Sequence, residues 1–334
     1  MMNDVVISGY CDEICVDKNL EQQFAVSTAI GMRFISLRFF DVGNGIKNIL
    51  KATDAELDAI LGLLNQYELR VSSIGSPLGK VKLFDIDDGT PNTFRDFDDY
   101  LRVEVNRTCE IATRLKTRLI RGFSFYHPQG TSADDYLSES ALRLRRIAEV
   151  CDKNGLTFGV EVEANLIGYS GDMLSRLAET VNHPALLLVF DGANLVSQGF
   201  STDEIWHQWQ AMKPWIGWLH VKDYFDHQQR VADSKRVVDE EALCGYVPVG
   251  QGTAGYPRIF EDLRSILPDL KARLAVRGIE NVYLDLEPHL RKGGQFGGYS
   301  GADGFGLAHR ALCDILRKSG LTFDNRDWPI DQGC

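Results

Sequence analysis

The sequence has no long apolar run. No stretch approaches the roughly 18–20 consecutive apolar residues that a helix needs to cross a bilayer. The N-terminal segment MMNDVVISGYCDEIC also lacks the basic stretch and apolar core of a secretory signal. We therefore expect a cytoplasmic protein without a membrane partner.

Basic residues are too few for a nucleic-acid partner. The chain has 36 Lys and Arg against 47 Asp and Glu, a formal net charge of −11. Binding to a phosphate backbone needs a basic surface, so the composition indicates no nucleic-acid partner. A small anionic substrate stays open, because the local field in a cleft can oppose the net charge.

Cysteine provides no disulfide framework. The seven cysteines are an odd number without regular spacing, and we expect them to be reduced thiols. Cys11 and Cys15 could form half of a metal site, but no second Cys or His pair completes it. Glycine and proline are scattered, and the sequence contains no internal repeat or low-complexity tract.

The sequence does contain short β-branched runs that alternate with longer stretches of helical period. This alternation is typical of β/α units on a parallel sheet. We expect strands at 5–10, 34–39, 70–75, 118–123, 156–163, 186–191, 216–221 and 282–287. Eight such units close a barrel. The sequence thus predicts an α/β fold, a (β/α)8 TIM barrel, as a single domain over residues 1–334.

Two connections are longer than the usual few residues. They are 76–93, after the third strand, and 223–257, after the seventh. Both follow strands, so they belong to the face on which barrels of this kind carry their chemistry. We expect lids or binding loops there, with disordered insertions as the alternative.

Four late strands end in residues that can bind a metal. These residues are Glu163, Asp191, His220 and Glu287. The carboxyl ends of barrel strands meet at one mouth, so the four become neighbours. Glu161 has the same strand parity as Glu163 and is its rival. We prefer Glu163 because it lies closer to the expected strand end.

Three carboxylates and one imidazole, without a thiolate, form a set of mostly hard ligands. This set suits Mn²⁺ best, with Mg²⁺, Co²⁺ and Zn²⁺ as the other options. It also leaves coordination positions for water and substrate oxygens. We expect one divalent ion as the cofactor.

The phrases VEVEAN, VFDGANL, WLHVKD and LDLEPHL resemble the successive ligand motifs of the xylose isomerase-like barrel superfamily. That group includes sugar and sugar-phosphate isomerases and epimerases, inosose dehydratases and endonuclease IV proteins. In its epimerases the first and last glutamates bind the metal and also exchange substrate protons from opposite faces. The resemblance implies that Glu163 and Glu287 are both ligands and catalytic residues, with Asp191 and His220 as the remaining ligands.

These features favour a divalent-metal-dependent isomerase or epimerase of a sugar, sugar phosphate or polyol ketone, acting by proton transfer through an enediolate. The first alternative is a dehydratase or lyase on a keto sugar, like an inosose dehydratase or a C-glycoside deglycosidase subunit. A non-catalytic sugar-binding barrel is the second. An endonuclease IV-like phosphodiesterase is disfavoured, because His220 alone among the seven histidines ends an expected strand.

Further side chains near the expected mouth are candidates for binding the carbohydrate substrate. Arg38, Arg121 and Lys222 either contact substrate or pair with buried carboxylates. Asn194 stands where many relatives carry a histidine, which makes the ketohexose 3-epimerases a less close match. The other candidates are His127, His289, Arg291 and Gln295. A homo-oligomer is left open.

Overall fold

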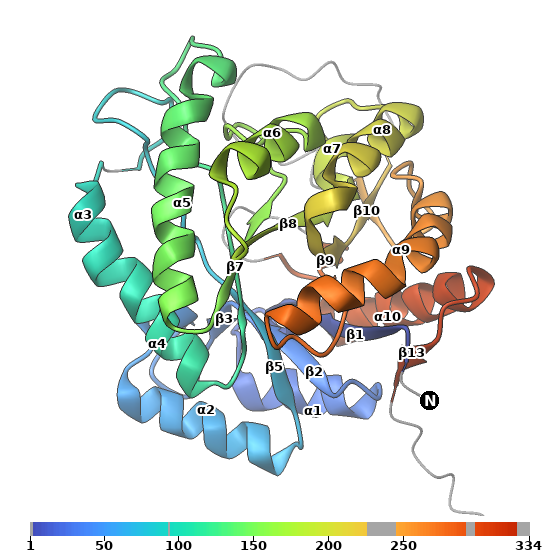
Figure 1. The fold of residues 1–334 in the computed structure, drawn as a ribbon. Coiled ribbons are helices and arrows are strands. Elements are labelled where there is room, and N and C mark those ends of the chain that lie inside the picture. The colour runs from blue at the N-terminus through green and yellow to red at the C-terminus, as the bar shows by residue number, and fades with distance from the viewer. Residues whose placement is uncertain (1–2, 93, 226–244, 292–297, 326–334) are drawn as a thin grey trace, which may run out of the picture.

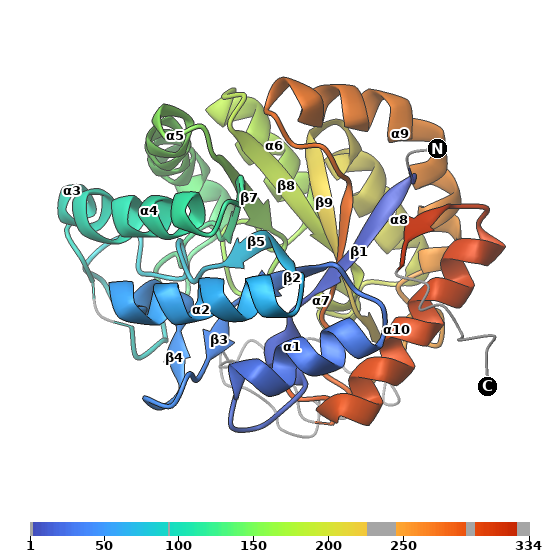
Figure 2. The ribbon, with the colours of Figure 1, turned by 90° about the horizontal axis from the view of Figure 1, so that it is seen from below.

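The computed structural model describes residues 3–92, 94–225, 245–291 and 298–325. Its main sheet has the strand order β13-β1-β12-β9-β8-β7-β6-β5-β2, and its pairings are parallel. Apart from the short β13 (Phe323–Asp324), these are the strands that the sequence predicts. The sheet is curled and helices surround it, as Figures 1 and 2 show. The α/β TIM-barrel fold is confirmed.

Several strands end earlier than predicted. Their bounds are β1 Val5–Gly9, β2 Phe34–Leu37, β5 Arg70–Gly75, β6 Leu119–Gly122, β7 Thr157–Glu161, β8 Leu186–Asp191, β9 Ile216–Val221 and β12 Tyr283–Leu286. The first and second barrel strands meet through one parallel bridge, from Tyr10 to Ser36. This bridge brings the two ends of the curled sheet together.

The helices lie in the order expected of repeated β/α units. They are α1 Leu20–Ala29, α2 Asp54–Gln66, α4 Asn106–Arg114, α5 Leu137–Lys153, α6 Gly171–Val181, α8 Thr202–Met212, α9 Tyr256–Val276 and α10 Gly301–Lys318. The short α3 (Phe97–Tyr100) and a π-helical turn, Leu101–Val105, lead directly into α4. The short α7, Gly192–Val196, follows β8.

Local signals explain where these helices begin and end. Thr53 and Glu56 form a reciprocal capping box at the start of α2, which satisfies backbone N–H groups that have no partner within the helix. The predicted stop after α5 is also present, since Asn154 is the C-terminal cap and Gly155 has a φ of +68°. Only glycine adopts that backbone angle without a steric cost.

Trp218 fills part of the barrel interior because the facing strand carries a glycine. The indole is fully buried, and a Cβ atom at Gly159 would lie 2.1 Å from one of its ring carbons. A glycine in β7 therefore makes room for the largest side chain in β9.

We predict that Gly159→Ala lowers the free energy of unfolding by about 1–3 kcal/mol, because the added methyl group overpacks the barrel. Thermal or urea unfolding measures this loss. Gly62→Ala is the matched control, since Gly62 lies in α2 with no atom within 4 Å of an added Cβ. That variant should gain about 0.5–1 kcal/mol. An unchanged stability of Gly159→Ala would contradict the packing of Trp218.

The long connection after β9 contains a short pair of strands. After β9, the short strand β10 (Asp223–Tyr224) pairs antiparallel with β11 (Tyr246–Val247). The buried Asp223 carboxylate accepts backbone hydrogen bonds from Gly250, Gly252 and Ala254, which ties the end of the connection to the end of β9. Residues 226–244 lie outside the described part. The role of the two long connections as lids and the single-domain division of residues 1–334 remain predictions.

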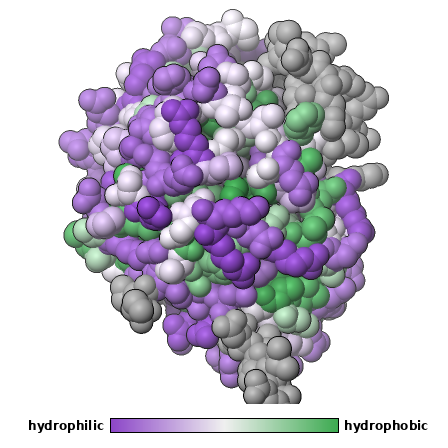
Figure 3. All heavy atoms as spheres, turned by 90° about the vertical axis from the view of Figure 1, so that its right-hand side faces the viewer, coloured by the Kyte–Doolittle hydropathy of each residue, from purple (hydrophilic) through white to green (hydrophobic). Residues whose placement is uncertain are grey.

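The surface is mixed in polarity. Figure 3 shows polar side chains over much of one face, with apolar patches between them. Among the described residues, no helix is both long and apolar enough to cross a membrane.

Candidate metal centre

Four side chains from neighbouring strands converge at the carboxyl end of the barrel. Glu161 and Asp191 are the last residues of β7 and β8, His220 lies in β9, and Glu287 directly follows β12. One possible ligand atom from each lies within 4.8 Å of those of the others, and all four residues are buried. The register explains part of this convergence, because Asp191 is paired with His220 across β8 and β9.

Glu163, the predicted first ligand, is not part of this cluster. Strand β7 ends at Glu161, so the chain has already turned away at Glu163. The Glu163 side chain is 24 % exposed, and its carboxylate pairs with the Lys80 ammonium at 2.9 Å. The rival Glu161 has the same parity and occupies the level of the other three. The structure thus groups Glu161, and not the preferred Glu163, with the other three predicted ligands, because the alternation of valine and glutamate continues two residues beyond the end of the strand.

The imidazole of His220 is held in a defined orientation. Its Nε2 lies 3.3 Å from the hydroxyl group of Tyr10, within hydrogen-bond distance. Its Nδ1 lies 3.2 Å from Oε1 of Glu161 and 3.6 Å from Oε2 of Glu287. The ring therefore turns Nδ1 toward the carboxylates, and a proton on Nε2 would leave Nδ1 free as a ligand.

Two buried atoms of the cluster, Nδ1 of His220 and Oδ2 of Asp191, have no hydrogen bond of suitable geometry to any described residue. Their contacts are the ion pairs with Glu161 and Lys222. A buried polar atom without a hydrogen bond costs free energy, and each such case in a folded protein needs an explanation. A divalent cation bound by the imidazole and the three carboxylates would satisfy both atoms. The side chains present therefore fit one metal ion.

Two buried cations, Lys222 and Arg121, border the cluster. The Lys222 ammonium lies 3.0 Å from Oδ2 of Asp191 and 3.0 Å from Oε2 of Glu287. Nε of Arg121 lies 3.2 Å from Oε2 of Glu161. These cations keep the buried carboxylates paired, which is needed because an isolated buried charge is strongly destabilising.

Arg38 joins the same network from the end of β2. Its Nη1 donates to Oε1 of Glu287 at 2.5 Å, and its Nε donates to Oδ2 of Asp12 at 3.1 Å. Arg38, Arg121 and Lys222 were predicted either to contact substrate or to pair with carboxylates. The structure places all three in carboxylate pairs.

The pKa values of the carboxyl groups follow from burial and these neighbours. Burial raises the pKa of Asp191 to about 7, with Glu161 and Glu287 adding to the rise and Lys222 opposing it. For Glu161, His220 and Arg121 outweigh burial and lower the pKa to about 2. Lys222 therefore offsets only part of the effect of burial on Asp191, and a divalent cation would add the positive charge that keeps this carboxyl group ionised.

The remaining predicted residues differ in their positions. Nδ2 of Asn194 donates to Oε1 of Glu161 at 3.2 Å, so Asn194 supports a member of the cluster. Nδ1 of His127 contacts its own loop, 3.1 Å from Oγ1 of Thr131. Arg291 pairs with Asp303 near the surface. Gln295 lies outside the described residues.

Asp12 and Glu13 were missed by the sequence analysis. They lie in the short 3-10 helix η1, Cys11–Glu13, which follows β1. Both are buried, and Glu13 contacts His289, another predicted site residue. The signal was present, since two acidic residues closely follow the first expected strand. The expected metal ligands came only from the last four strands, and Asp12 and Glu13 follow the first.

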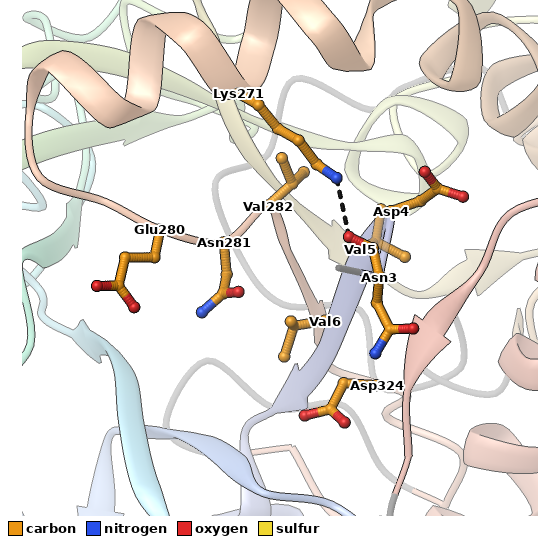
Figure 4. A pocket seen from close by; sticks show the side chains of 9 residues that line it. All are labelled: Asn3, Asp4, Val5, Val6, Lys271, Glu280, Asn281, Val282 and Asp324. Atoms are coloured by element: carbon orange, nitrogen blue, oxygen red, sulfur yellow. Dashed lines mark hydrogen bonds between the residues drawn. The ribbon is translucent and has the colours of Figure 1, made fainter. Parts of the chain in front are cut away.

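A cavity of about 230 Å³ lies at the opposite end of the barrel (Figure 4). Its lining includes the starts of β1 and β12 and the side chains of Asp4, Glu280 and Asp324. Lys271 spans one side and donates to the backbone oxygen of Asn3 at 2.8 Å. In barrels of this class the amino ends of the strands contribute to stability, whereas the carboxyl ends carry the chemistry.

Comparison with solved structures finds the same barrel. A probable 3-DHS dehydratase, AsbF, from Bacillus anthracis has a TM-score of 0.64 and 17% identity, over 92% of this chain and 98% of that one. The IOLI protein with a bound zinc atom has a TM-score of 0.64 and 15% identity, over 95% and 99%. A D-psicose 3-epimerase with D-tagatose, from Clostridium cellulolyticum H10, has a TM-score of 0.61 and 14% identity, over 95% and 99%.

Sequence comparison adds one partial match and one family. A probable tRNA-dihydrouridine synthase from Aquifex aeolicus is 29% identical over 126 residues, only 37% of that protein and 35% of this chain. The family described as xylose isomerase-like TIM barrel matches residues 24–268, well over half of the chain. The chain therefore belongs to the xylose isomerase-like TIM barrel family.

Proposed function

We propose that the protein is a metal-dependent isomerase or epimerase of a sugar, sugar phosphate or polyol ketone. The observation that carries this proposal is the convergence of Glu161, Asp191, His220 and Glu287, with two buried ligand atoms lacking hydrogen bonds. The ligand set favours Mn²⁺ among the divalent ions. The solved relatives with epimerase and dehydratase names share the fold, and they support this class of chemistry by analogy.

The two glutamates are the proposed proton-transfer groups. A divalent ion would polarise the substrate carbonyl and acidify the neighbouring C–H group. Oε1 of Glu161 and Oε2 of Glu287 lie 3.2 and 3.6 Å from His220 Nδ1, so both carboxylates border the same candidate metal position. One carboxylate would remove the proton, and for epimerisation the other, in its protonated form, would donate a proton to the opposite face. For isomerisation a proton would be delivered to the adjacent carbon. Arg121 and Asn194 hold Glu161 in place for this step.

We predict that Mn²⁺ stabilises the folded protein. A ligand that binds only the native state adds about 2.7 kcal/mol at a hundredfold excess over its Kd. For a chain of this size the melting temperature should rise by about 4 °C, and EDTA should reverse the rise. Calorimetry with Mn²⁺, Mg²⁺, Co²⁺ and Zn²⁺ measures the effect and ranks the metals. Asp191→Asn is the control, and it should lose most of the rise.

No stabilisation by any of these metals would contradict the metal centre. The non-catalytic sugar-binding barrel would then be the better hypothesis, and sugars should still raise the melting temperature.

The reaction itself is tested by product analysis in D₂O. A panel of ketoses, ketose phosphates and inososes is incubated with the Mn²⁺-loaded protein and followed by NMR. Epimerisation or isomerisation exchanges one C–H proton for deuterium with retention of all hydroxyl groups. Loss of water or of an aglycone would instead identify an elimination.

Elimination is the second candidate because additional proton-carrying side chains flank Glu287. The ring of Tyr246, in β11, meets the His289 ring edge-on at 5.1 Å between centroids. Nε2 of His289 lies 3.7 Å from Oε1 of Glu287. A dehydratase needs a group that protonates the departing hydroxyl, and here this group would be the Tyr246 hydroxyl, or His289 when Nε2 carries a proton. The cytoplasmic location and a homo-oligomeric state remain predictions.

A further inference from the structure

A second cluster adjoins the candidate metal centre. Glu13, Glu287 and His289 each present a possible ligand atom within 4.8 Å of the other two, and all three are buried. Glu13 follows β1, whereas Glu287 and His289 follow β12. Strands β1 and β12 are neighbours in the sheet, so the barrel brings residues 276 positions apart into contact.

The carboxylate of Glu13 has a fixed orientation. Its Oε2 accepts hydrogen bonds from the backbone N–H of His289 at 2.8 Å and from the hydroxyl group of Ser300 at 2.7 Å. Its Oε1 lies 2.7 Å from Nδ1 of His289. This short distance directs Oε1 at the imidazole, although neither atom forms a hydrogen bond of suitable geometry with any described residue.

The ring of His289 is confined on the other sides. His289 has a φ of +50°, a left-handed conformation that is strained for a residue other than glycine. A Cβ at Gly298 would lie 1.6 Å from Nδ1, so glycine allows the loop to pass against the ring. Strained backbone of this kind persists where the surrounding structure holds it, and it is concentrated at functional sites.

The other ring nitrogen faces the metal centre. Nε2 of His289 lies 3.7 Å from Oε1 of Glu287, which is beyond hydrogen-bond distance. In the neutral tautomer whose Nδ1–H faces the Glu13 carboxylate, the other ring nitrogen, Nε2, carries a lone pair and can accept a hydrogen bond. The geometry thus directs a hydrogen-bond acceptor to the edge of the candidate metal centre.

We propose that Glu13 positions His289 so that its Nε2 accepts a hydrogen bond from a hydroxyl group of the substrate. The inference rests on the proposed function and narrows its substrate class to ketoses and cyclic keto-polyols with a free hydroxyl group beside the reacting carbons. Glu13 is a positioning residue in this arrangement, and His289 is the residue that contacts substrate.

A second metal ion is the competing explanation of the same three side chains. Arg38 argues against it, because Nη1 lies 2.5 Å from Oε1 of Glu287 and Nη2 lies 3.9 Å from Oε1 of Glu13. A permanent cation therefore already lies against both carboxylates. A second ion there would add positive charge beside the guanidinium.

The tautomer of His289 tests the proposal directly. The full chain is labelled with ¹⁵N-histidine, loaded with Mg²⁺, and studied by long-range ¹H–¹⁵N correlation. His289→Asn assigns the signal. We expect the Nδ1–H tautomer in the wild type and its loss in Glu13→Gln, whose amide N–H can donate to Nδ1. The Nε2–H tautomer in the wild type would overturn the proposal.

Ser300→Ala provides a milder variant if Glu13→Gln does not fold. It removes one of the hydrogen bonds to Glu13 and leaves both members of the pair in place. The His289 signal should then keep its Nδ1–H pattern but broaden. A sharp, unchanged signal would show that Glu13 does not hold the ring.

Binding of D-tagatose, a neutral ketose, tests the contact with substrate. We expect it to shift the Nε2 signal in the wild type, and we expect Glu13→Gln to weaken its binding about tenfold, the effect of one lost hydrogen bond. His289→Gln should weaken it equally, and the double variant no further, if the two act as one unit. D-tagatose binding without a shift of Nε2 would overturn the substrate contact.

Metal titration separates the remaining outcomes. If Glu13 positions His289, both the wild type and Glu13→Gln should bind one ion. A second ion that binds the wild type and not Glu13→Gln would show that Glu13, Glu287 and His289 form a second metal site. Glu56→Gln is the matched control for loss of a buried carboxylate, because Glu56 pairs with Lys47 at the start of α2. Absence of any D-tagatose binding counts against the proposed function. The tautomer of His289 tests separately whether Glu13 positions the imidazole.

Discussion

Glu161→Gln is expected to lower kcat by about 10²–10⁴-fold, the usual contribution of a group that transfers a proton in the rate-determining step. The amide keeps the shape of the side chain and an oxygen that can bind the metal, but it cannot take up a proton at neutral pH. Glu163→Gln should retain kcat within about threefold, because Glu163 lies outside the cluster and pairs with the partly exposed Lys80. Steady-state turnover at saturating Mn²⁺ measures both values.

The two variants form a matched pair, since the same substitution is made two residues apart. Both must keep the melting temperature and the Mn²⁺-induced rise for the comparison to report on proton transfer. A larger loss of kcat in Glu163→Gln than in Glu161→Gln would reverse the assignment. Glu287→Gln should resemble Glu161→Gln, because Glu287 is the second proposed proton-transfer group.

Lys222→Met is expected to have the largest effect on stability without metal. The ammonium lies 3.0 Å from a carboxylate oxygen of both Asp191 and Glu287, and all three side chains are buried. Its removal leaves buried negative charge unpaired, which costs about 3–5 kcal/mol. Bound Mn²⁺ replaces part of the missing positive charge. The Mn²⁺-induced rise in melting temperature should therefore be larger in Lys222→Met than in the wild type.

Calorimetry in EDTA and in excess Mn²⁺ gives the four melting temperatures that this comparison needs. Lys80→Met is the control, because its ion pair with Glu163 is about one quarter exposed on each side, at 26 % and 24 %. Partly exposed pairs contribute about 0–1 kcal/mol, so this variant should show the wild-type response to Mn²⁺. An equal Mn²⁺-induced rise in Lys222→Met and in the wild type would show that the Lys222 ammonium does not balance the negative charge of the metal ligands.

The cationic side chains around the cluster balance the charge of its carboxylates. Arg38, Arg121 and Lys222 each pair with a carboxylate of the cluster, so they balance part of its negative charge before any substrate arrives. A metal and a polyhydroxylated substrate then need only modest rearrangement of these pairs. Preorganised charge of this kind is the main means by which enzymes stabilise a developing negative charge.

Much of the fold was predictable because its signals are local. Short, largely apolar runs, such as those of β8 and β9, are buried on both faces of a parallel sheet and read directly as strands. The Asn154-Gly155 stop after α5 needs no tertiary information, since glycine alone relieves the backbone angle. The order of Asp191, His220 and Glu287 at successive strand ends was visible for the same reason.

The choice between Glu161 and Glu163 was not local. Both have the inward parity of one strand, and the apolar run continues past Glu161. The residue that joins the cluster depends on where hydrogen bonding between β7 and β8 stops. That point is set by neighbouring strands and by the loop that follows, so the sequence pattern favoured the wrong glutamate.

By itself the sequence determined the barrel, its order of strands, and three of the four residues of the candidate metal centre. Tertiary structure alone decided that Glu161 is the fourth, that the nearby arginines and lysine pair with carboxylates, and that Glu13 meets His289. The physical reason is distance along the chain. Strand and helix periods report on neighbours within a few residues, whereas closure of the barrel joins residues that no local pattern connects.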